Sequence, residues 1–167
     1  MKKYEFTGET KIVAGVTLKR IRALISFGFV AKGEIGGFIE DEKNLSHDGN
    51  AWVTDNACVA GNAWVTGNAC VTGNARVTGN ACVAGNAWVT DNADYMLIGS
   101  IGSRNDFTTF YKDIDGGISV KCGCFSGTIE EFREKVEETH GTNTKHAKVY
   151  QAAANLAEMQ ILDQEAS

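Results

Sequence analysis

The densest group of side chains able to bind an anion lies just past the middle of the chain. Its donors are Ser103, Arg104, Asn105, Thr108 and Thr109. Aromatic residues, Tyr111 among them, stand beside these donors. Guanidinium groups form strong charge-assisted bonds to phosphate, and aromatic rings stack on bases. This composition predicts a site for a small phosphorylated, nucleotide-type ligand. An ordinary hairpin turn, with Arg104 solvated or paired with Asp106, fits the same residues equally well.

Two further groups have side chains suited to catalysis or metal binding. His47 is the histidine nearest to the central repeat, and as a general base it would suit an acyltransferase. Cys122 and Cys124 flank a single glycine, and one strand can offer at most two ligands from them, short of a structural zinc site. We expect both cysteines to share one strand face and pack inward. The sequence therefore predicts no metal site and no cofactor.

A six-residue repeat fills the middle of the chain. From Asn50 the pattern Asn-Ala-x-Val-x-x recurs for seven full periods. No α-helix has this period, because 3.6 residues per turn would spread the valines around the whole surface. A short β-strand followed by a corner has it, with alanine and valine facing inward and the residue between them facing outward. The corner asparagines would then stack in columns whose amides can pair. The valines are Val53, Val59, Val65, Val71, Val77, Val83 and Val89.

This repeat resembles that of the left-handed β-helix proteins built from hexapeptides. The resemblance implies a parallel β-helix with three hexapeptides in each coil of about 18 residues, and a homotrimer. The segments Gly102-Ser-Arg-Asn-Asp-Phe-Thr-Thr-Phe110 and Cys122-Gly-Cys-Phe-Ser-Gly-Thr128 resemble the α+β tails of uncharacterised phage and prophage proteins that carry such repeats. A phage-encoded protein is the expectation that follows.

Outward positions of such a β-helix fall on three faces. Trp52 and Trp88 share one face and Trp64 lies on another, so exposed tryptophans predict an interface between copies of the chain. The alternative is that flanking segments of the same chain cover them. Arg76 is the charged residue among the fully repeated outward positions, and a salt bridge to Asp94 is preferred there over a ligand contact.

The flanks of the repeat predict a mainly β protein in three segments. Residues 1–48 form an N-terminal β cap and a first coil, 49–101 the β-helix, and 102–167 a hairpin and two helices. Strands are expected at 2–6, 16–24, 107–112 and 118–125, and 95–101 suits a strand or a last coil. A capping box at Thr128 opens a helix that His140-Gly141 closes, with Phe132 on its inner face. A second helix spans about 145–162 and turns Tyr150 and Leu156 inward.

Bulk properties narrow the possible partners. The net charge of −5 is spread along the chain, which argues against binding of DNA or RNA. The apolar stretch at 23–31 is far shorter than the ~20 residues that cross a bilayer, so no membrane segment is expected. Five cysteines, an odd number, predict reduced thiols and a cytoplasmic protein, in the host cytoplasm if a phage encodes it.

Together these observations favour a non-catalytic homotrimeric binding protein over an enzyme. The sharpest hypothesis is a phage-encoded counter-defence protein that sequesters a nucleotide-type signal or another small anionic ligand. Two alternatives stay open: a hexapeptide acyltransferase that uses a CoA thioester with His47 as base, and a structural or protein-interaction scaffold.

Overall fold

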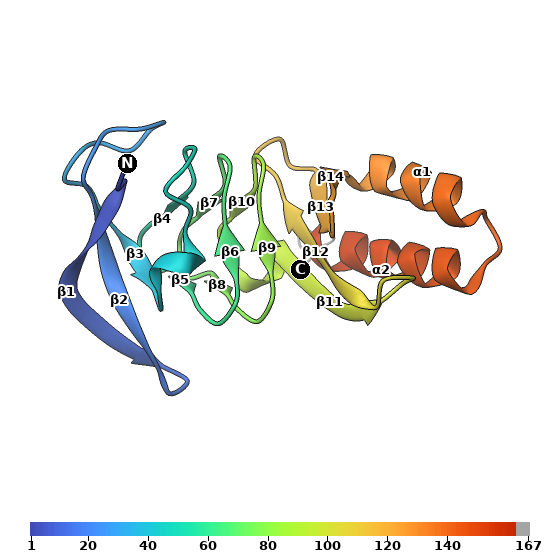
Figure 1. Cartoon of the computed structure of the whole chain (residues 1–167), viewed down its shortest axis with the longest axis horizontal. Helices are drawn as coiled ribbons and strands as arrows, with labels where there is room; N and C mark the ends of the chain where they lie inside the picture. Colours follow the sequence, from blue (N-terminus) through green and yellow to red (C-terminus); the bar gives the residue numbers. More distant parts are fainter. Residues whose placement is uncertain (163–167) are drawn as a thin grey trace. The chain divides into compact units, whose positions relative to one another are not determined.

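The computed structural model describes residues 1–162, and the chain forms two compact units. The N-terminal unit is Met1–Asn92 and the C-terminal unit Ala93–Ser167. Residues 1–162 contain four separate β-sheets and two α-helices, and both α-helices follow the last strand (Figure 1). The expectation of a mainly β chain with two C-terminal helices is confirmed, whereas the three-segment division stays a prediction.

A long antiparallel hairpin begins the N-terminal unit. Strands β1 (Tyr4–Val13) and β2 (Val16–Ala23) are joined through Ala14 and Gly15, both at positive φ, 50° and 81°. Two residues at positive φ are the signature of the tight turn that suits the twist of a hairpin. Strand β1 runs well beyond Phe6, where the sequence predicted its end. Strand β3 (Ile35–Ile39) pairs antiparallel with β2 and parallel with β5.

The repeat forms seven strands of two residues, and each pairs with the strand three repeats away. They are β4 (Trp52–Val53), β5 (Cys58–Val59), β6 (Trp64–Val65), β7 (Cys70–Val71), β8 (Arg76–Val77), β9 (Cys82–Val83) and β10 (Trp88–Val89). The parallel pairs are β4 with β7, β7 with β10, β5 with β8, and β6 with β9. Short 3-10 turns cover Glu42–Asn44 and Asn92–Asp94.

The inward and corner positions of the repeat are as the sequence predicts. All seven repeat valines have an exposed fraction of 0%. At the corners, Asn50 donates to Asn68 at 3.0 Å, and Asn68 donates to Asn86 at 3.2 Å. Gly67 has φ 69°, and a Cβ there would lie 2.9 Å from the backbone nitrogen of Gly85. At position 67 the corner therefore needs glycine both for its conformation and for the close stacking, whereas Asp55 adopts φ 54° at the equivalent position of another repeat.

The prediction of a continuous left-handed parallel β-helix is wrong. The repeat strands are distributed over three separate sheets, and none of the four sheets is closed. One of the three is mixed, because the antiparallel strands β1, β2 and β3 extend the β5–β8 pair. Two-residue strands separated by corners specify only local parallel pairs. The antiparallel strands β1, β2 and β3 can therefore extend one of these pairs into a mixed sheet.

The three tryptophans do not form exposed faces as expected. Trp52 is fully buried, because the rings of Tyr4 and Phe27 pack edge-on against it at 6.4 Å and 5.4 Å. Trp88 is half-buried and lies 6.3 Å from the Phe29 ring. Trp64 alone of the three is exposed, at 45%. The alternative reading, in which the chain's own flanks cover the tryptophans, is confirmed for Trp52.

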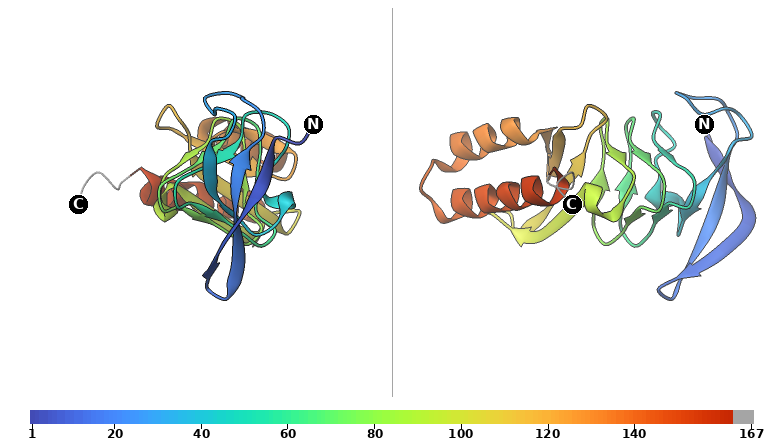
Figure 2. Two further views of the ribbon diagram at one scale, coloured as in Figure 1. Left: turned by 90° about the vertical axis from the view of Figure 1, so that its left-hand side faces the viewer. Right: turned by 180° about the vertical axis from the view of Figure 1, so that it is seen from behind.

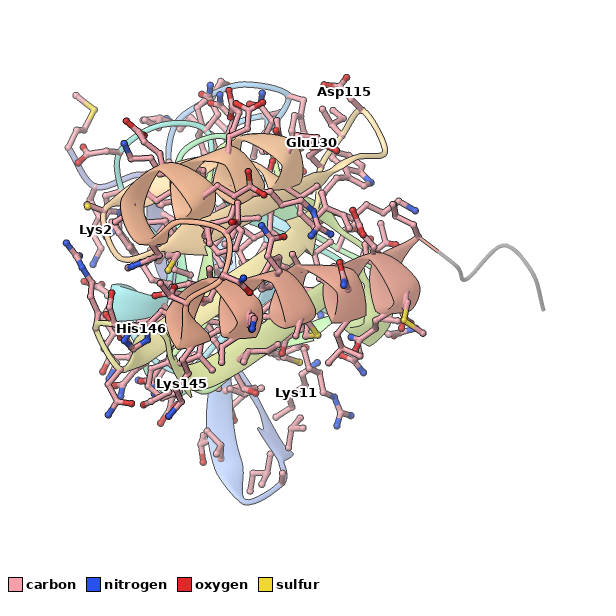
Figure 3. All side chains as sticks on the ribbon, turned by 90° about the vertical axis from the view of Figure 1, so that its right-hand side faces the viewer. Lys2, Lys11, Asp115, Glu130, Lys145 and His146 are labelled. Carbon is pink, nitrogen blue, oxygen red and sulfur yellow. The ribbon has the colours of Figure 1, made fainter. Side chains whose placement is uncertain are left out.

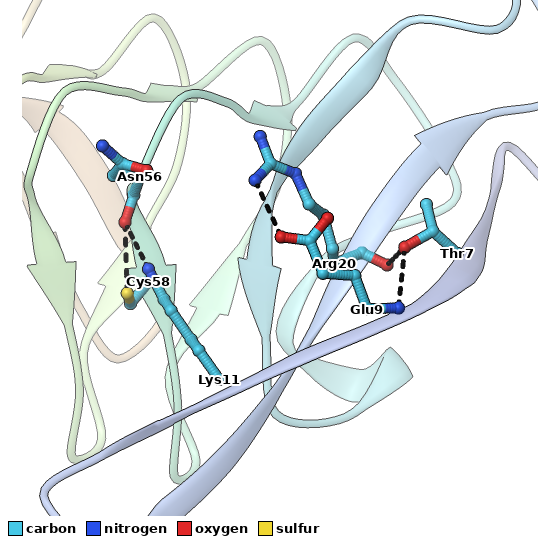
Figure 4. A network of polar contacts seen from close by, with 6 residues as sticks. All are labelled: Thr7, Glu9, Lys11, Arg20, Asn56 and Cys58. Carbon is cyan, nitrogen blue, oxygen red and sulfur yellow. Dashed lines mark hydrogen bonds and ion pairs between the residues drawn. The ribbon is translucent and has the colours of Figure 1, made fainter.

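Cations of the hairpin tie it to the repeat. Lys11 donates to the Asn56 carbonyl at 2.9 Å, and the Cys58 thiol donates to the same oxygen at 3.3 Å (Figure 4). Lys11 also lies 3.9 Å from the centre of the Phe38 ring, with the Arg20 guanidinium 4.9 Å from that centre. Lys11 and Arg20, both from the hairpin, thus pack on the Phe38 ring of β3 and hold the hairpin against β3 and β5.

Lys3 is a fully buried cation, with 1% of its surface exposed. Its ammonium donates to the Ala51 carbonyl at 2.8 Å and to the Gly49 carbonyl at 3.4 Å. It also lies 4.7 Å from the centre of the Phe27 ring. Burial lowers the pKa of Lys3 to about 8, although the nearby Asp48 opposes that change. The charge is thus held by carbonyl dipoles and a ring at a cost in solvation.

The C-terminal unit is an antiparallel sheet with both helices packed on it. The sheet order is β11 (Tyr95–Ile101), β12 (Asp106–Lys112), β13 (Ile118–Cys122) and β14 (Phe125–Thr128). Helices α1 (Ile129–His140) and α2 (Lys145–Ile161) lie side by side (Figure 2). Their shared core contains Phe110, Val120, Phe132 and Tyr150.

Local signals place these helices correctly. The Thr128 hydroxyl accepts from the Glu131 N–H and the Glu131 carboxylate accepts from the Thr128 N–H, which confirms the capping box. Gly141 follows the last residue of α1 at φ 71°. Tyr150 is buried as predicted, but Leu156 is 51% exposed, so its inward placement is wrong. The helix turns Ala154 into the core in its place.

Replacing Lys3 with methionine is expected to remove an alkaline rise in stability. The pKa of Lys3 is about 8 in the folded chain and 10.5 ordinarily, so the unfolded chain binds this proton more tightly. The contribution of Lys3 to folding stability therefore grows as the pH rises from about 8 to 10. The same contribution is lost as the pH falls back through about 8. Urea unfolding should show a gain of about 1–3 kcal/mol in wild type over this window. Lys32→Met, at an exposed position, should keep the gain; equal slopes for wild type and Lys3→Met would contradict the argument.

Candidate functional site

A pocket of about 470 Å³ opens in the C-terminal unit. The turn after β11 contributes Ser103 and Arg104, and the turn between β13 and β14 contributes Cys122 and Cys124. Helix α1 contributes the face that carries Phe132, Lys135, Val136, Thr139 and His140, and α2 contributes Tyr150. This volume lies within the ~300–1,000 Å³ range of small-molecule sites.

Aromatic rings form the inner wall of the pocket. Phe132 meets Tyr150 edge-to-face, with ring centres 5.6 Å apart, and Phe125 at 5.6 Å. His140 stacks on Tyr150 at 5.8 Å. Phe132 and Tyr150 belong to the core of the unit and Phe125 packs against it, so packing fixes the positions of these three rings. The wall offers a rigid apolar surface to a ligand.

The Tyr150 hydroxyl connects the two turns that border the pocket. It lies against Gly102, the residue before Ser103, and it is close enough to the Cys122 and Ser103 side chains for both to affect its pKa. Burial, together with the Cys122 side chain, raises the pKa of Tyr150. On the other side of Cys122, the Thr108 hydroxyl donates to its sulfur at 3.2 Å. The hydroxyl of one tyrosine thus lies close to residues that are far apart in sequence.

Two cationic side chains, Arg104 and Lys135, line the pocket together with His140. Arg104 is exposed and lies over the turn at Gly123, where its Nη1 is 2.8 Å from the position that a Cβ would take. Lys135 is exposed and pairs with Glu138 at 2.6 Å. His140 lies 5.7 Å from His146 between their ring centres, and Figure 3 labels His146 and Lys145 at the start of α2. Within residues 1–162, no aspartate or glutamate lines this pocket.

A second hollow beside the pocket has the opposite character. Glu131, Glu134 and Glu138 line it together with Lys135. An anion entering from solvent is therefore repelled on that side and attracted to the end formed by Arg104 and Ser103. The contrast gives the pocket one preferred end for negative charge.

The structure brings together only part of the predicted ligand site. Ser103 and Arg104 line the pocket, whereas Asn105 is exposed in the turn at φ 53°. Thr109 and Tyr111 are buried and alternate to the strand face opposite Thr108. Thr108 reaches the site only through the Cys122 sulfur. Arg76 is exposed on β8, in the N-terminal unit.

His47 sits in a packed position near the N-terminus. Its Nδ1 accepts the Lys3 backbone N–H at 3.2 Å, and its ring stacks on Tyr4 at 4.4 Å. Burial lowers the pKa of His47. The Nδ1 atom of His47 therefore already accepts a hydrogen bond from the backbone of the same chain.

The prediction that Cys122 and Cys124 share a buried strand face is wrong. Strand β13 ends at Cys122, and Gly123 turns the chain at φ 58°. Cys122 is half-buried and Cys124 is exposed. The glycine ends the alternation that the sequence reading extended through both cysteines.

Several pocket residues escaped the sequence reading because they come from the helices. Phe132, Val136 and His140 recur every four residues, which places them on one face of α1. On the sequence alone this spacing predicts only the inner face of a helix. His140 continues that face and is half-buried, so it marks where the face leaves the core.

Comparisons with known proteins supply no family. No protein-family model matches the chain, and no curated protein matches it. The expected resemblance to phage hexapeptide-repeat proteins is therefore wrong, since the four-sheet structure also departs from their fold. Nothing in the structure supports a phage origin or nucleotide binding. Self-association stays a prediction.

Two absences apply to residues 1–162. No helix in this range is both long enough and apolar enough to cross a membrane. No group of three or more His, Cys, Asp or Glu side chains in it is arranged to hold a metal ion.

Gly102→Ala is expected to disrupt the pocket, whereas Gly116→Ala serves as a matched control. Both glycines have positive φ, 72° and 85°, but only at Gly102 would a Cβ overlap the Tyr150 hydroxyl; at Gly116 nothing lies within 4 Å. The two variants share the backbone strain and differ in the clash. Chemical denaturation should show Gly102→Ala losing about 1–3 kcal/mol more than Gly116→Ala. Equal losses would mean that Tyr150 is not held against this turn.

Proposed function

We propose that this protein is a non-catalytic binding protein whose C-terminal pocket takes a small anionic molecule with an apolar or aromatic part. The observation that carries the proposal is the placement of Arg104 beside an aromatic wall, without a carboxylate among the described lining residues. Lys135 also lines the pocket, but its ammonium is paired with Glu138. The chain as a whole has a net charge of −5. A cationic rim on an acidic protein is a local feature that selects for anions.

The pocket suits an elongated ligand that is charged at one end. Arg104, with the Ser103 hydroxyl beside it, can bind two oxygens of a carboxylate or phosphate. The rings of Phe132 and Tyr150 lie deeper and are 3% and 5% exposed. An apolar body placed on them would lose contact with water while its charged end stays at the rim.

The acyltransferase alternative gains no support from the position of His47. A general base needs a free nitrogen facing a bound substrate, and the Nδ1 of His47 accepts the Lys3 N–H. We also propose a reducing, cytoplasmic setting, since no disulfide joins the cysteines of residues 1–162.

The expected effect of Arg104→Gln is weaker binding of a simple aromatic anion. Phenyl phosphate carries the two features that the pocket recognises, and isothermal titration calorimetry can measure its dissociation constant. Removing a charge-assisted bond of about 1.5–3 kcal/mol should weaken binding about 10- to 100-fold. Lys148→Gln removes one charge from the exposed surface of α2 outside the pocket and should bind as wild type.

Benzyl alcohol tests the contribution of charge in the same titration, because it keeps the ring and lacks the anion. It should bind far more weakly than phenyl phosphate. Failure of wild type to bind phenyl phosphate, or equal weakening in Arg104→Gln and Lys148→Gln, would overturn the proposed function and favour a scaffold role.

A further inference from the structure

Two cysteines border the pocket on either side of a tight turn. Cys122 ends β13, Gly123 has φ 58°, and Cys124 precedes β14. Both cysteines line the pocket. A turn at the intervening glycine brings its flanking residues closer than an extended strand would, which suits a bond between their sulfurs.

Polar groups surround this turn in a way that suits a reactive sulfur. Cys122 receives a hydrogen bond from Thr108 and another contact from the Tyr150 hydroxyl. The Arg104 guanidinium lies against Gly123, between the two cysteines. A cation therefore lies at the residue between the two cysteines, and the Thr108 hydroxyl donates to the Cys122 sulfur.

The remaining cysteines provide an internal comparison. Cys58 and Cys70 are buried, at 4% and 1% exposed, and Cys82 is half-buried. Burial raises the pKa of Cys70 to about 11, so this thiol stays protonated and inert at neutral pH. Cys124 is the exposed thiol among the five.

We propose that the pocket reacts with a low-molecular-weight disulfide that carries carboxylates, with Cys124 as the attacking thiol and Cys122 as the resolving thiol. The inference rests on the proposed anion-binding function and names the ligand class. Arg104 holds a carboxylate of the disulfide, and the rings of the wall receive its carbon skeleton. The disulfide then lies over the turn that carries both cysteines.

The exchange balances without any further reactant. Cys124 first loses its proton to water, and its thiolate attacks one sulfur of the disulfide. A Cys124–ligand disulfide forms, and the other half leaves as a thiolate. Cys122 then gives its proton to that thiolate and attacks the Cys124 sulfur. The second half leaves as a thiolate and takes up the proton that Cys124 released. Two protein thiols are oxidised to one disulfide, and the small disulfide is reduced to two thiols.

The test compares an anionic and a neutral disulfide on the reduced, full-length protein. Oxidised glutathione is the anionic probe and bis(2-hydroxyethyl) disulfide the neutral one. Intact-mass spectrometry with peptide mapping follows each cysteine. In wild type, oxidised glutathione should produce a Cys122–Cys124 disulfide. The Cys122→Ser variant should instead stop at a mixed disulfide on Cys124. In the Cys124→Ser variant the remaining thiol, Cys122, should react at least about tenfold more slowly than Cys124 does in wild type.

Charge selection provides the readout that an ordinary exposed thiol would lack. The quantity compared is the rate of reaction with oxidised glutathione divided by the rate with the neutral probe. This ratio should be about tenfold higher for Cys124 than for an unstructured cysteine peptide. Arg104→Gln should abolish this preference, and Lys148→Gln should keep it. Both variants retain Cys122 and Cys124.

Two results separate this inference from the proposed function. If phenyl phosphate binds through Arg104 but oxidised glutathione shows no preference, or Cys124 and Cys82 react equally fast, the redox inference is overturned and the binding function stands. If phenyl phosphate does not bind and the preference is also missing, both are overturned.

Discussion

Backbone hydrogen bonds between residues three repeats apart hold the N-terminal unit together. The Trp52 N–H donates to the Ala69 carbonyl at 2.9 Å, and the Thr54 N–H donates to the Val71 carbonyl at 2.9 Å. This spacing leaves room inside only for small or branched apolar side chains, which is why the repeat alternates alanine and valine. The outward position carries no such limit, so it can hold tryptophan, cysteine or arginine. The rings of Tyr4 and Phe27 cover Trp52, whereas Trp64 stays exposed.

The C-terminal unit depends on a different arrangement, in which one residue serves both the core and the pocket. The Tyr150 ring packs against Phe132, while its hydroxyl reaches Ser103 and Cys122. Packing therefore fixes the ring, and the ring fixes the polar groups at the rim. A site built in this way is preorganised, because binding a ligand need not order the side chains that receive it.

Sequence patterns predicted the features that depend on near neighbours along the chain. The six-residue period gave the buried valines and the asparagine columns, and Thr128 and Glu131 gave the start of α1. Features that depend on distant residues were missed or wrong. Tyr4 and Phe27 bury Trp52, and no local pattern at residue 52 indicates it. The period also could not show that β1 and β2 would join one set of repeat strands into a mixed sheet.

The candidate site follows the same division. Ser103 and Arg104 were found because donors cluster in one turn, whereas Lys135, His140 and Tyr150 reach the pocket from helices that the sequence places far away. Whether Cys124 faces inward depended on a single backbone angle at Gly123. Composition therefore indicated a preference for anions, but only the fold defines the space in which an anion would sit.

The three-repeat pairing also limits how the length of the chain can change. Removing one six-residue repeat would keep every valine inside, yet it would move the last strand, β10, from its sheet to a neighbouring one. Removing three consecutive repeats would instead shorten each of the three sheets by one strand and leave the final strand where it was. Insertions and deletions that keep the direction in which the chain leaves the N-terminal unit must therefore come in steps of about 18 residues.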